Sequence, residues 1–148
     1  MSFWRPYRIA AVLLVIFCAL HTAGGMFGRK DLGFAANAVF VSMQSVSFNF
    51  GGATCTWYGF WLGFGLTVSV FLLLAAVVSW QLDKVAAADF GPVEVIAWAL
   101  ALSLAGTAAL SWMYFFAGSA IMATLVAALL VAGAIGKGFT RERRGSPG

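Results

Sequence analysis

The sequence predicts an all-α, polytopic membrane protein: an antiparallel four-helix transmembrane bundle with a short amphipathic helix on its outer side. Of the 148 residues, 62% are hydrophobic, the mean hydropathy is +0.94, and only 9% are charged. Soluble proteins carry roughly 25% charged residues, and a soluble fold of this length cannot bury so much apolar surface. The composition therefore excludes a soluble enzyme, a nucleic-acid module and a disordered chain.

The first predicted span covers about residues 9–27 and follows the basic residues Arg5 and Arg8. A basic start before an apolar run also resembles a signal peptide, but residues 18–22 form a poor small-x-small cleavage site. We therefore expect a retained helix, with Trp4 and Tyr7 at its inner interface and Cys18 as a small buried residue.

An uncharged segment at 32–56 belongs to the predicted outer region, residues 28–56. A helical spacing over about 33–45 indicates a short helix on or in the outer leaflet, since apolar and polar residues fall on different faces. The apolar face is Leu32, Ala36, Val39, Phe40 and Met43, and the polar face is Asn37, Gln44 and Ser45. Residues 46–50 alternate and predict an extended stretch before a turn at Gly51 and Gly52.

Three further spans follow. The second is predicted at about 57–80, a run without charge. Between Glu94 and Lys137 there are roughly 40 uncharged residues, about 60 Å as one helix and so roughly twice the bilayer core. This stretch must fold back, which we place at 114–118 because Gly118 permits a tight reversal. The third span is then about 92–113, with Pro92 and Glu94 in its first turn, and the fourth about 119–136.

The basic residues predict the orientation of the spans. With four spans, one side of the membrane receives seven Lys and Arg residues and the other receives two. The first group is Arg5, Arg8, Lys84, Lys137, Arg141, Arg143 and Arg144, and the second is Arg29 and Lys30. We therefore expect both termini in the cytoplasm, a single transmembrane domain over 1–139, and a flexible cytoplasmic tail over 140–148.

Small residues at four-residue spacing predict where the helices touch, because small side chains let membrane helices approach closely. In the second span these are Gly59, Gly63, Gly65 and Ser69, and in the third Ala97, Ala101, Ala105 and Gly106. In the fourth they are Ala120, Thr124, Ala128, Ala132 and Gly136. We expect these stripes to pack within the bundle, while a dimer face is the alternative.

His21 is the single histidine and lies inside the first span, where ionisable groups are costly and often functional. The favoured interpretation is a neutral imidazole hydrogen-bonded to the outer segment or to a tyrosine. Ligand contact or proton transfer is the second, and metal or haem ligation the third. A candidate outer-leaflet pocket for a lipid or quinone-like ligand would be lined by His21, Gln44, Tyr58, Trp61, Ser111 and Trp112.

The aromatic and glycine-rich start of the second span, residues 57–65, is interpreted first as an interfacial belt with a packing face. No phosphate loop, nucleophile motif, paired carboxylates or metal-spaced cluster is found in the sequence, so we predict no cofactor and no metal. The favoured function is a non-enzymatic accessory or binding component of the membrane. Expected partners are membrane lipid and either further copies or a larger membrane complex, and not nucleic acid. The alternative is an enzyme or binder acting on the lipid or quinone-like ligand.

Three segments resemble a family of small uncharacterised bacterial four-helix integral membrane proteins over about residues 10–82. They are residues 21–25 (HTAGG), residues 43–48 (MQSVSF), and residues 57–60 (WYGF) with 63–65 (GFG). The resemblance implies a multi-pass protein of the bacterial inner membrane. It implies no activity, cofactor or catalytic residue.

Overall fold

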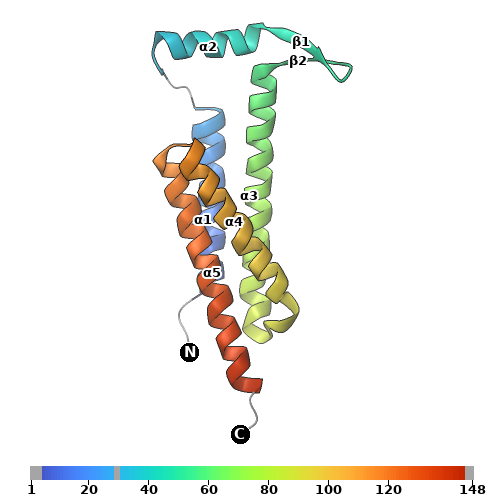
Figure 1. The fold of residues 1–148 in the computed structure, drawn as a ribbon, viewed down its shortest axis with the longest axis vertical. Helices are drawn as coiled ribbons and strands as arrows, with labels where there is room; N and C mark the ends of the chain where they lie inside the picture. The colour runs from blue at the N-terminus through green and yellow to red at the C-terminus, as the bar shows by residue number, and fades with distance from the viewer. Residues whose placement is uncertain (1–4, 29–30, 146–148) are drawn as a thin grey trace. The chain divides into compact units, whose positions relative to one another are not determined.

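The computed structural model describes residues 5–28 and 31–145 and is mostly helical (Figure 1). The elements, in chain order, are α1 (Pro6–Ala19), η1 (Leu20–Met26), α2 (Phe34–Ser45), β1 (Ser47–Phe50), β2 (Ala53–Thr56), α3 (Trp57–Ala88), η2 (Gly91–Val93), α4 (Glu94–Tyr114) and α5 (Ala117–Gly145).

Four helices in the described residues are long and apolar enough to cross a membrane, as predicted. They are Pro6–Met26, Trp57–Ala88, Gly91–Tyr114 and Ala117–Gly138. The chain reverses between Tyr114 and Ala117, within the predicted turn. α3 continues beyond the predicted end at Trp80, and α5 runs to Gly145, so residues 140–145 of the predicted flexible tail are helical. Residues 146–148 of that tail lie outside the described residues.

The chain divides into two compact units, which are described separately. The first comprises Met1–Phe17 and Leu72–Gly148, and the second comprises Cys18–Phe71. Nearly all the buried side chains belong to the first unit, where α4 and α5 pack side by side (Figure 1).

The core of the first unit is built from small residues spaced alternately by three and four positions. On α4 the buried residues are Ala97, Ala101, Leu104, Ala108 and Ser111, and on α5 they include Ala120, Ala123, Ala127, Leu130 and Ala134. The average spacing of these buried residues is 3.5. This spacing keeps them on one line along the helix, here called the seam, which faces a neighbouring helix. Alanine in the seam lets the backbones approach closely, which is how membrane helices gain packing energy.

The predicted four-residue stripes are partly wrong. Ala97, Ala101 and Ala120 are buried, but Ala105 and Gly106 on α4 are exposed. On α5, the exposed members are Thr124, Ala128, Ala132 and Gly136. The reason is geometric: four residues turn an α-helix about 40° past one full turn, so a strict four-residue stripe drifts off the contact face.

Tyr7, predicted at the inner interface, is 1% exposed and belongs to the core of the first unit. Its ring packs on α5, where a Cβ added to Gly133 would lie 2.8 Å from Cζ of Tyr7. The Ser79 hydroxyl donates a 2.7 Å hydrogen bond to the Tyr7 carbonyl, which joins α1 to α3. Nearby, Arg5 forms an ion pair with Asp83, and the Arg8 guanidinium lies 4.6 Å from the Trp80 ring centroid. Trp4 lies outside the described residues.

In the second unit, α2 confirms the helix predicted at about 33–45. Of its predicted apolar face, Ala36, Phe40 and Met43 are half-buried, whereas Leu32 and Val39 are exposed. The extended stretch at 46–50 is β1, and it pairs antiparallel with β2, a strand that the sequence did not predict. Gly51 and Gly52 form the two-residue turn with φ of 58° and 84°. Positive φ at both positions is typical of the type I′ hairpin turn and favours glycine.

Candidate functional site

The last part of the first span, η1 (Leu20–Met26), is a π-helix that carries His21. Its wider turn closes with a hydrogen bond from the Phe27 amide to the Thr22 carbonyl at 3.2 Å. π-Helical turns within α-helices often occur at functional sites. Gly24 and Gly25 lie within this turn and leave two of its positions without side chains.

A polar network joins this segment to α3 inside the second unit. His21 Nε2 lies 3.0 Å from the Gly65 carbonyl oxygen. One turn farther along α3, the hydroxyls of Thr22 and Ser69 are 2.8 Å apart, and the Cys18 thiol donates to the Ser69 carbonyl at 3.4 Å. The network satisfies polar groups that would otherwise be costly in an apolar environment.

When the His21 ring is neutral, its hydrogen-bond partner fixes the tautomer. A carbonyl oxygen only accepts hydrogen bonds, so Nε2 must carry the proton that it donates to Gly65. Nδ1 is then an acceptor. No residue that the structure describes hydrogen-bonds to Nδ1, although a Cβ on Gly25 would lie 3.7 Å from it. The predicted partner, the outer segment or a tyrosine, is replaced by the backbone of α3.

Gly65 allows this close approach. A Cβ at position 65 would collide with the Met26 side chain of the same π-helical segment. Ser69, the next small residue on this face of α3, is only 7% exposed. Of the stripe predicted for the second span, Gly65 and Ser69 therefore form a helix contact, whereas Gly59 and Gly63 are exposed.

The remaining candidate residues lie in different places. In the second unit, Tyr58 and Trp61 have ring centroids 5.5 Å apart, and Trp61 also contacts Phe40 of α2 at 5.6 Å. Gln44 is exposed on α2. Within the described part of the chain, neither Gln44 nor Tyr58 hydrogen-bonds to His21.

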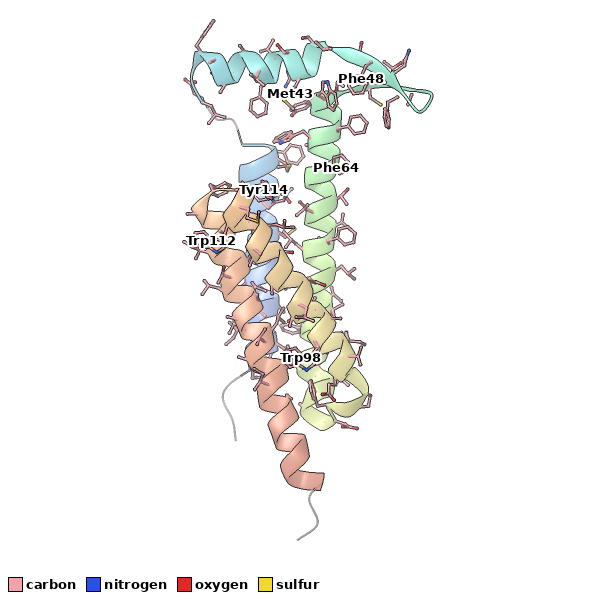
Figure 2. All side chains as sticks on the ribbon, viewed as in Figure 1. Met43, Phe48, Phe64, Trp98, Trp112 and Tyr114 are labelled. Atoms are coloured by element: carbon pink, nitrogen blue, oxygen red, sulfur yellow. The ribbon has the colours of Figure 1, made fainter. Side chains whose placement is uncertain are left out.

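Ser111 and Trp112 belong to α4 of the first unit. Ser111 is 4% exposed and contributes to the α4 seam. The Trp112 indole donates a 3.0 Å hydrogen bond to the Thr124 hydroxyl and so ties α4 to α5. Trp112 and Tyr114 both lie near the end of α4 (Figure 2). These contacts give both candidate residues a packing role within their own unit.

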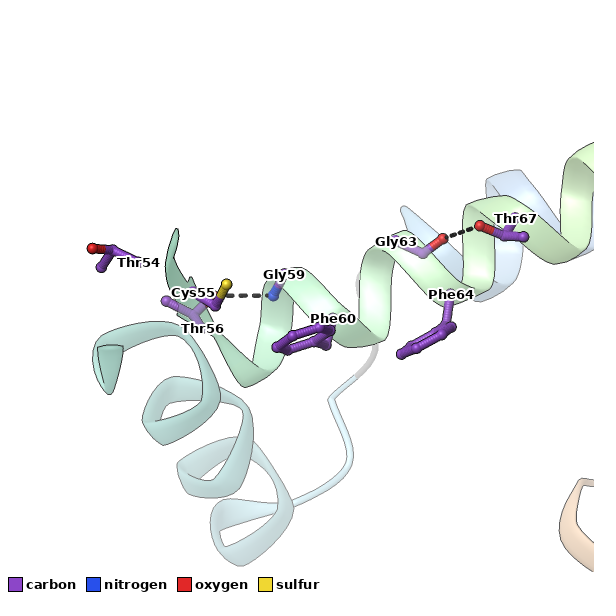
Figure 3. A pocket seen from close by; sticks show the side chains of 8 residues that line it. All are labelled: Thr54, Cys55, Thr56, Gly59, Phe60, Gly63, Phe64 and Thr67. Carbon is purple, nitrogen blue, oxygen red and sulfur yellow. Dashed lines mark hydrogen bonds between the residues drawn. The ribbon is translucent and has the colours of Figure 1, made fainter. Parts of the chain in front are cut away.

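An open groove of about 540 Å³, which was not predicted from the sequence, lies at the start of α3 (Figure 3). Its lining is Thr54, Cys55, Thr56, Gly59, Phe60, Gly63, Phe64 and Thr67. On α3 these residues recur every three or four positions and so share one helix face. That periodicity, with Gly59 and Gly63 four residues apart, was the signal available in the sequence.

The floor of the groove is formed by glycine. A Cβ at Gly63 would meet no atom within 4 Å, and one at Gly59 would meet only the Thr56 hydroxyl. Two of the three lining threonines are bonded to the backbone of α3: Thr56 accepts from the Gly59 amide at 3.0 Å, and Thr67 donates to the Gly63 carbonyl at 2.9 Å. The groove therefore presents a mainly apolar surface.

Aromatic rings form one wall of the groove. Phe60 and Phe64 stack with centroids 6.2 Å apart, and Phe48 of β1 stacks on Phe60 at 5.9 Å. Phe64 is 70% exposed. Figure 2 shows Met43 and Phe48 beside the start of α3.

At the start of α2, Asp31 accepts hydrogen bonds from the Gly33 amide at 3.0 Å and from the Asn37 side-chain amide at 2.8 Å. These two bonds stabilise the carboxylate and hold the pKa of Asp31 below its ordinary value. The Asn37 oxygen in turn accepts from the Leu32 amide at 3.3 Å. The polar face predicted for this helix thus organises its first turn.

Comparison with protein-family models, with curated proteins and with solved structures finds no match to this chain.

Proposed function

We propose that the chain is a non-enzymatic accessory or binding component of the bacterial inner membrane. In this proposal its four spans form an antiparallel bundle with both termini in the cytoplasm. The seven-to-two distribution of basic residues supports this orientation. The alternating small-residue seams on α4 and α5 support a bundle of closely packed helices.

The observation that carries the proposal is the open glycine face of α3. Glycine costs about 1 kcal/mol relative to alanine in a helix interior, and Gly63 has no neighbour that requires it. Close approach of another helix is the usual use of glycines four residues apart in a membrane helix. We assign the groove to helix docking and not to packing within the chain.

The proposed occupant is a second copy of the chain. One face of α3 carries both a notch, Gly59 and Gly63, and a projecting ridge, Phe60 and Phe64. In a two-fold symmetric dimer each copy offers the same patch, so the ridge of one copy can enter the notch of the other. Such docking would also cover the exposed Phe64 ring.

Filling the notch tests this proposal. We expect Gly63→Leu to weaken self-association by about tenfold or more, because overpacking a close contact costs roughly 1–3 kcal/mol. Stepwise photobleaching of singly labelled chains in lipid bilayers reports the number of copies directly. The matched control is Gly106→Leu on α4, an exposed helical glycine that also has no atom within 4 Å of an added Cβ.

We expect two bleaching steps for the wild type and for Gly106→Leu. We expect one step for Gly63→Leu. A wild-type chain that bleaches in one step at every protein-to-lipid ratio contradicts the proposal. Equal behaviour of the two variants contradicts the assignment of the groove.

A second candidate function is a membrane-embedded binder or enzyme acting on a lipid or quinone-like ligand near His21. The specific observation in its favour is the Nδ1 atom, which no described residue uses. The glycine at position 25, next to Nδ1, supports the same candidate.

A further inference from the structure

We propose that His21 Nδ1 is the acceptor for a hydroxyl group on an apolar ligand, and that Gly25 is glycine in order to leave this nitrogen accessible. The inference rests on the second candidate function and is independent of self-association. It concerns one nitrogen of one side chain in the second unit.

The ring is oriented before any ligand arrives. Nε2 donates to the Gly65 carbonyl at 3.0 Å, so the neutral ring presents an acceptor at Nδ1. The hydrogen bond to the Gly65 carbonyl orients the ring, and the missing side chain at Gly25 lies next to Nδ1. A fixed tautomer and a fixed ring plane are what a recognition histidine needs, because they remove reorganisation upon binding.

The space at Nδ1 comes from missing side chains. A Cβ on Gly25 would lie 3.7 Å from Nδ1, in van der Waals contact with it, and would cover the nitrogen. A Cβ on Gly24 would meet nothing within 4 Å. His21 is half-buried, so its side chain is not sealed within the core.

The surroundings select a neutral donor. His21 lies less than two turns before the end of the span at Met26, where an apolar ligand can place a polar head near the interface. A charged group would be costly at this depth. The described residues contain no group of three His, Cys, Asp or Glu side chains that could hold a metal. A hydroxyl is the simplest neutral donor, found on both hydroquinones and diacylglycerols.

The single histidine allows a direct test. In tag-free protein labelled with nitrogen-15 histidine, the two imidazole signals come from His21 alone. We expect a decyl-substituted benzohydroquinone or a diacylglycerol to shift the Nδ1 signal and leave the Nε2 signal in place. A response to one of these molecules alone identifies the source of the hydroxyl. The dimethyl ether of the hydroquinone has the same ring without donors and should give no shift.

Matched glycine variants provide the control. Gly25→Ala places a methyl group against Nδ1 and should weaken binding by about tenfold or more, because an uncompensated buried acceptor costs roughly 1–3 kcal/mol. Gly24→Ala makes the same change of helix propensity without covering Nδ1 and should bind as the wild type does.

Each contrary result has a distinct meaning. If the dimethyl ether binds as well as the hydroquinone, or if Gly25→Ala and Gly24→Ala bind equally well, Nδ1 is not the acceptor. Either result would still indicate a ligand site that does not use Nδ1. Absence of any response to both hydroxyl compounds overturns the inference together with the second candidate function. The titrations can be repeated in Gly63→Leu, the variant expected to weaken self-association. Ligand binding is thereby measured separately from self-association.

Discussion

Tyr7 and Gly133 show how one absent side chain sets the distance between two helices. The Tyr7 ring fills the space above Gly133 and is almost completely buried. An aromatic ring is rigid and cannot bend away from a new methyl group as a methionine could. The contact therefore depends on glycine at position 133.

We expect Gly133→Ala to lower the free energy of unfolding by about 1–2 kcal/mol, because overpacking exceeds the roughly 1 kcal/mol gained in helix propensity. Reversible unfolding in mixed micelles measures the change. Gly136→Ala on the same helix is the control, since its added Cβ would meet nothing within 4 Å. Equal stability of the two variants would show that Tyr7 does not press on Gly133.

Asp31 makes a prediction about pH. Its pKa is lowered mainly by the Gly33 amide and secondly by the Asn37 side chain. A carboxyl whose folded pKa is lowered contributes stability above its unfolded pKa, near 3.8, and loses it as the pH falls through the folded pKa. The start of α2 should therefore loosen only under acidic conditions.

Asn37→Ala should raise the pKa of Asp31 toward its ordinary value, because one of the two stabilising bonds is removed. A carbon-13 titration of the Asp31 carboxyl measures this directly. Asn49→Ala is a suitable control, since Asn49 accepts a hydrogen bond from Thr54 on the hairpin instead. An unchanged Asp31 pKa in Asn37→Ala would assign the shift to the backbone amide alone.

At the scale of elements, α4 shows why a stripe of small residues does not identify a contact face. Ala101 is fully buried, whereas Ala105, one four-residue step later, is exposed. The buried seam continues through Leu104 and Ala108. Residues spaced by 3.5 on average stay on the face that contacts the neighbouring helix. Residues spaced strictly by four turn progressively away from that face.

Ala101→Leu should destabilise the protein by about 1–3 kcal/mol, since the larger side chain has no space in the α4 seam. Ala105→Leu adds the same atoms on an exposed face and should change stability little. Thermal unfolding of both variants in the same detergent compares them. Destabilisation by Ala105→Leu alone would reverse the assignment of the seam.

At the scale of the whole molecule, an even number of spans places both termini on one side. We expect a cysteine at Ser146→Cys, in a Cys55→Ser background, to react with a membrane-impermeant maleimide in inverted vesicles and not in intact spheroplasts. Cys18 is 6% exposed and should not react with the maleimide. The wild-type Cys55, on the predicted outer side, should show the opposite pattern. Labelling of position 146 in spheroplasts would overturn the orientation.

The number and type of elements could be predicted because they depend on local properties. The four apolar helices, the short helix α2 and the turn at Gly51 and Gly52 each follow from composition or backbone preference within a short segment. Transfer of a segment into lipid depends on its own residues, so no tertiary contact is needed to recognise a span. The strand β2 was missed because its pairing partner decides it.

The candidate site was only partly predictable, because it depends on contacts between residues far apart in the sequence. His21 was recognised as unusual, but its partner is a backbone carbonyl. Every residue has a backbone carbonyl, so the sequence does not indicate which one is the partner. Ser111 and Trp112 were grouped with His21 because they were expected at the same depth, yet their contacts lie within the α4 and α5 pair. The open groove on α3 required knowing which glycines were left uncovered.

The sequence alone thus determined that the chain has four membrane-competent helices, a short helix after the first of them and a glycine turn. Only the tertiary structure decided which faces of those helices touch, that Tyr7 is buried, and which nitrogen of His21 is left open. The physical reason is that lipid and side chains are equally apolar, so hydrophobicity drives helices into the bilayer without specifying how they pair. Pairing depends instead on shape and on individual hydrogen bonds.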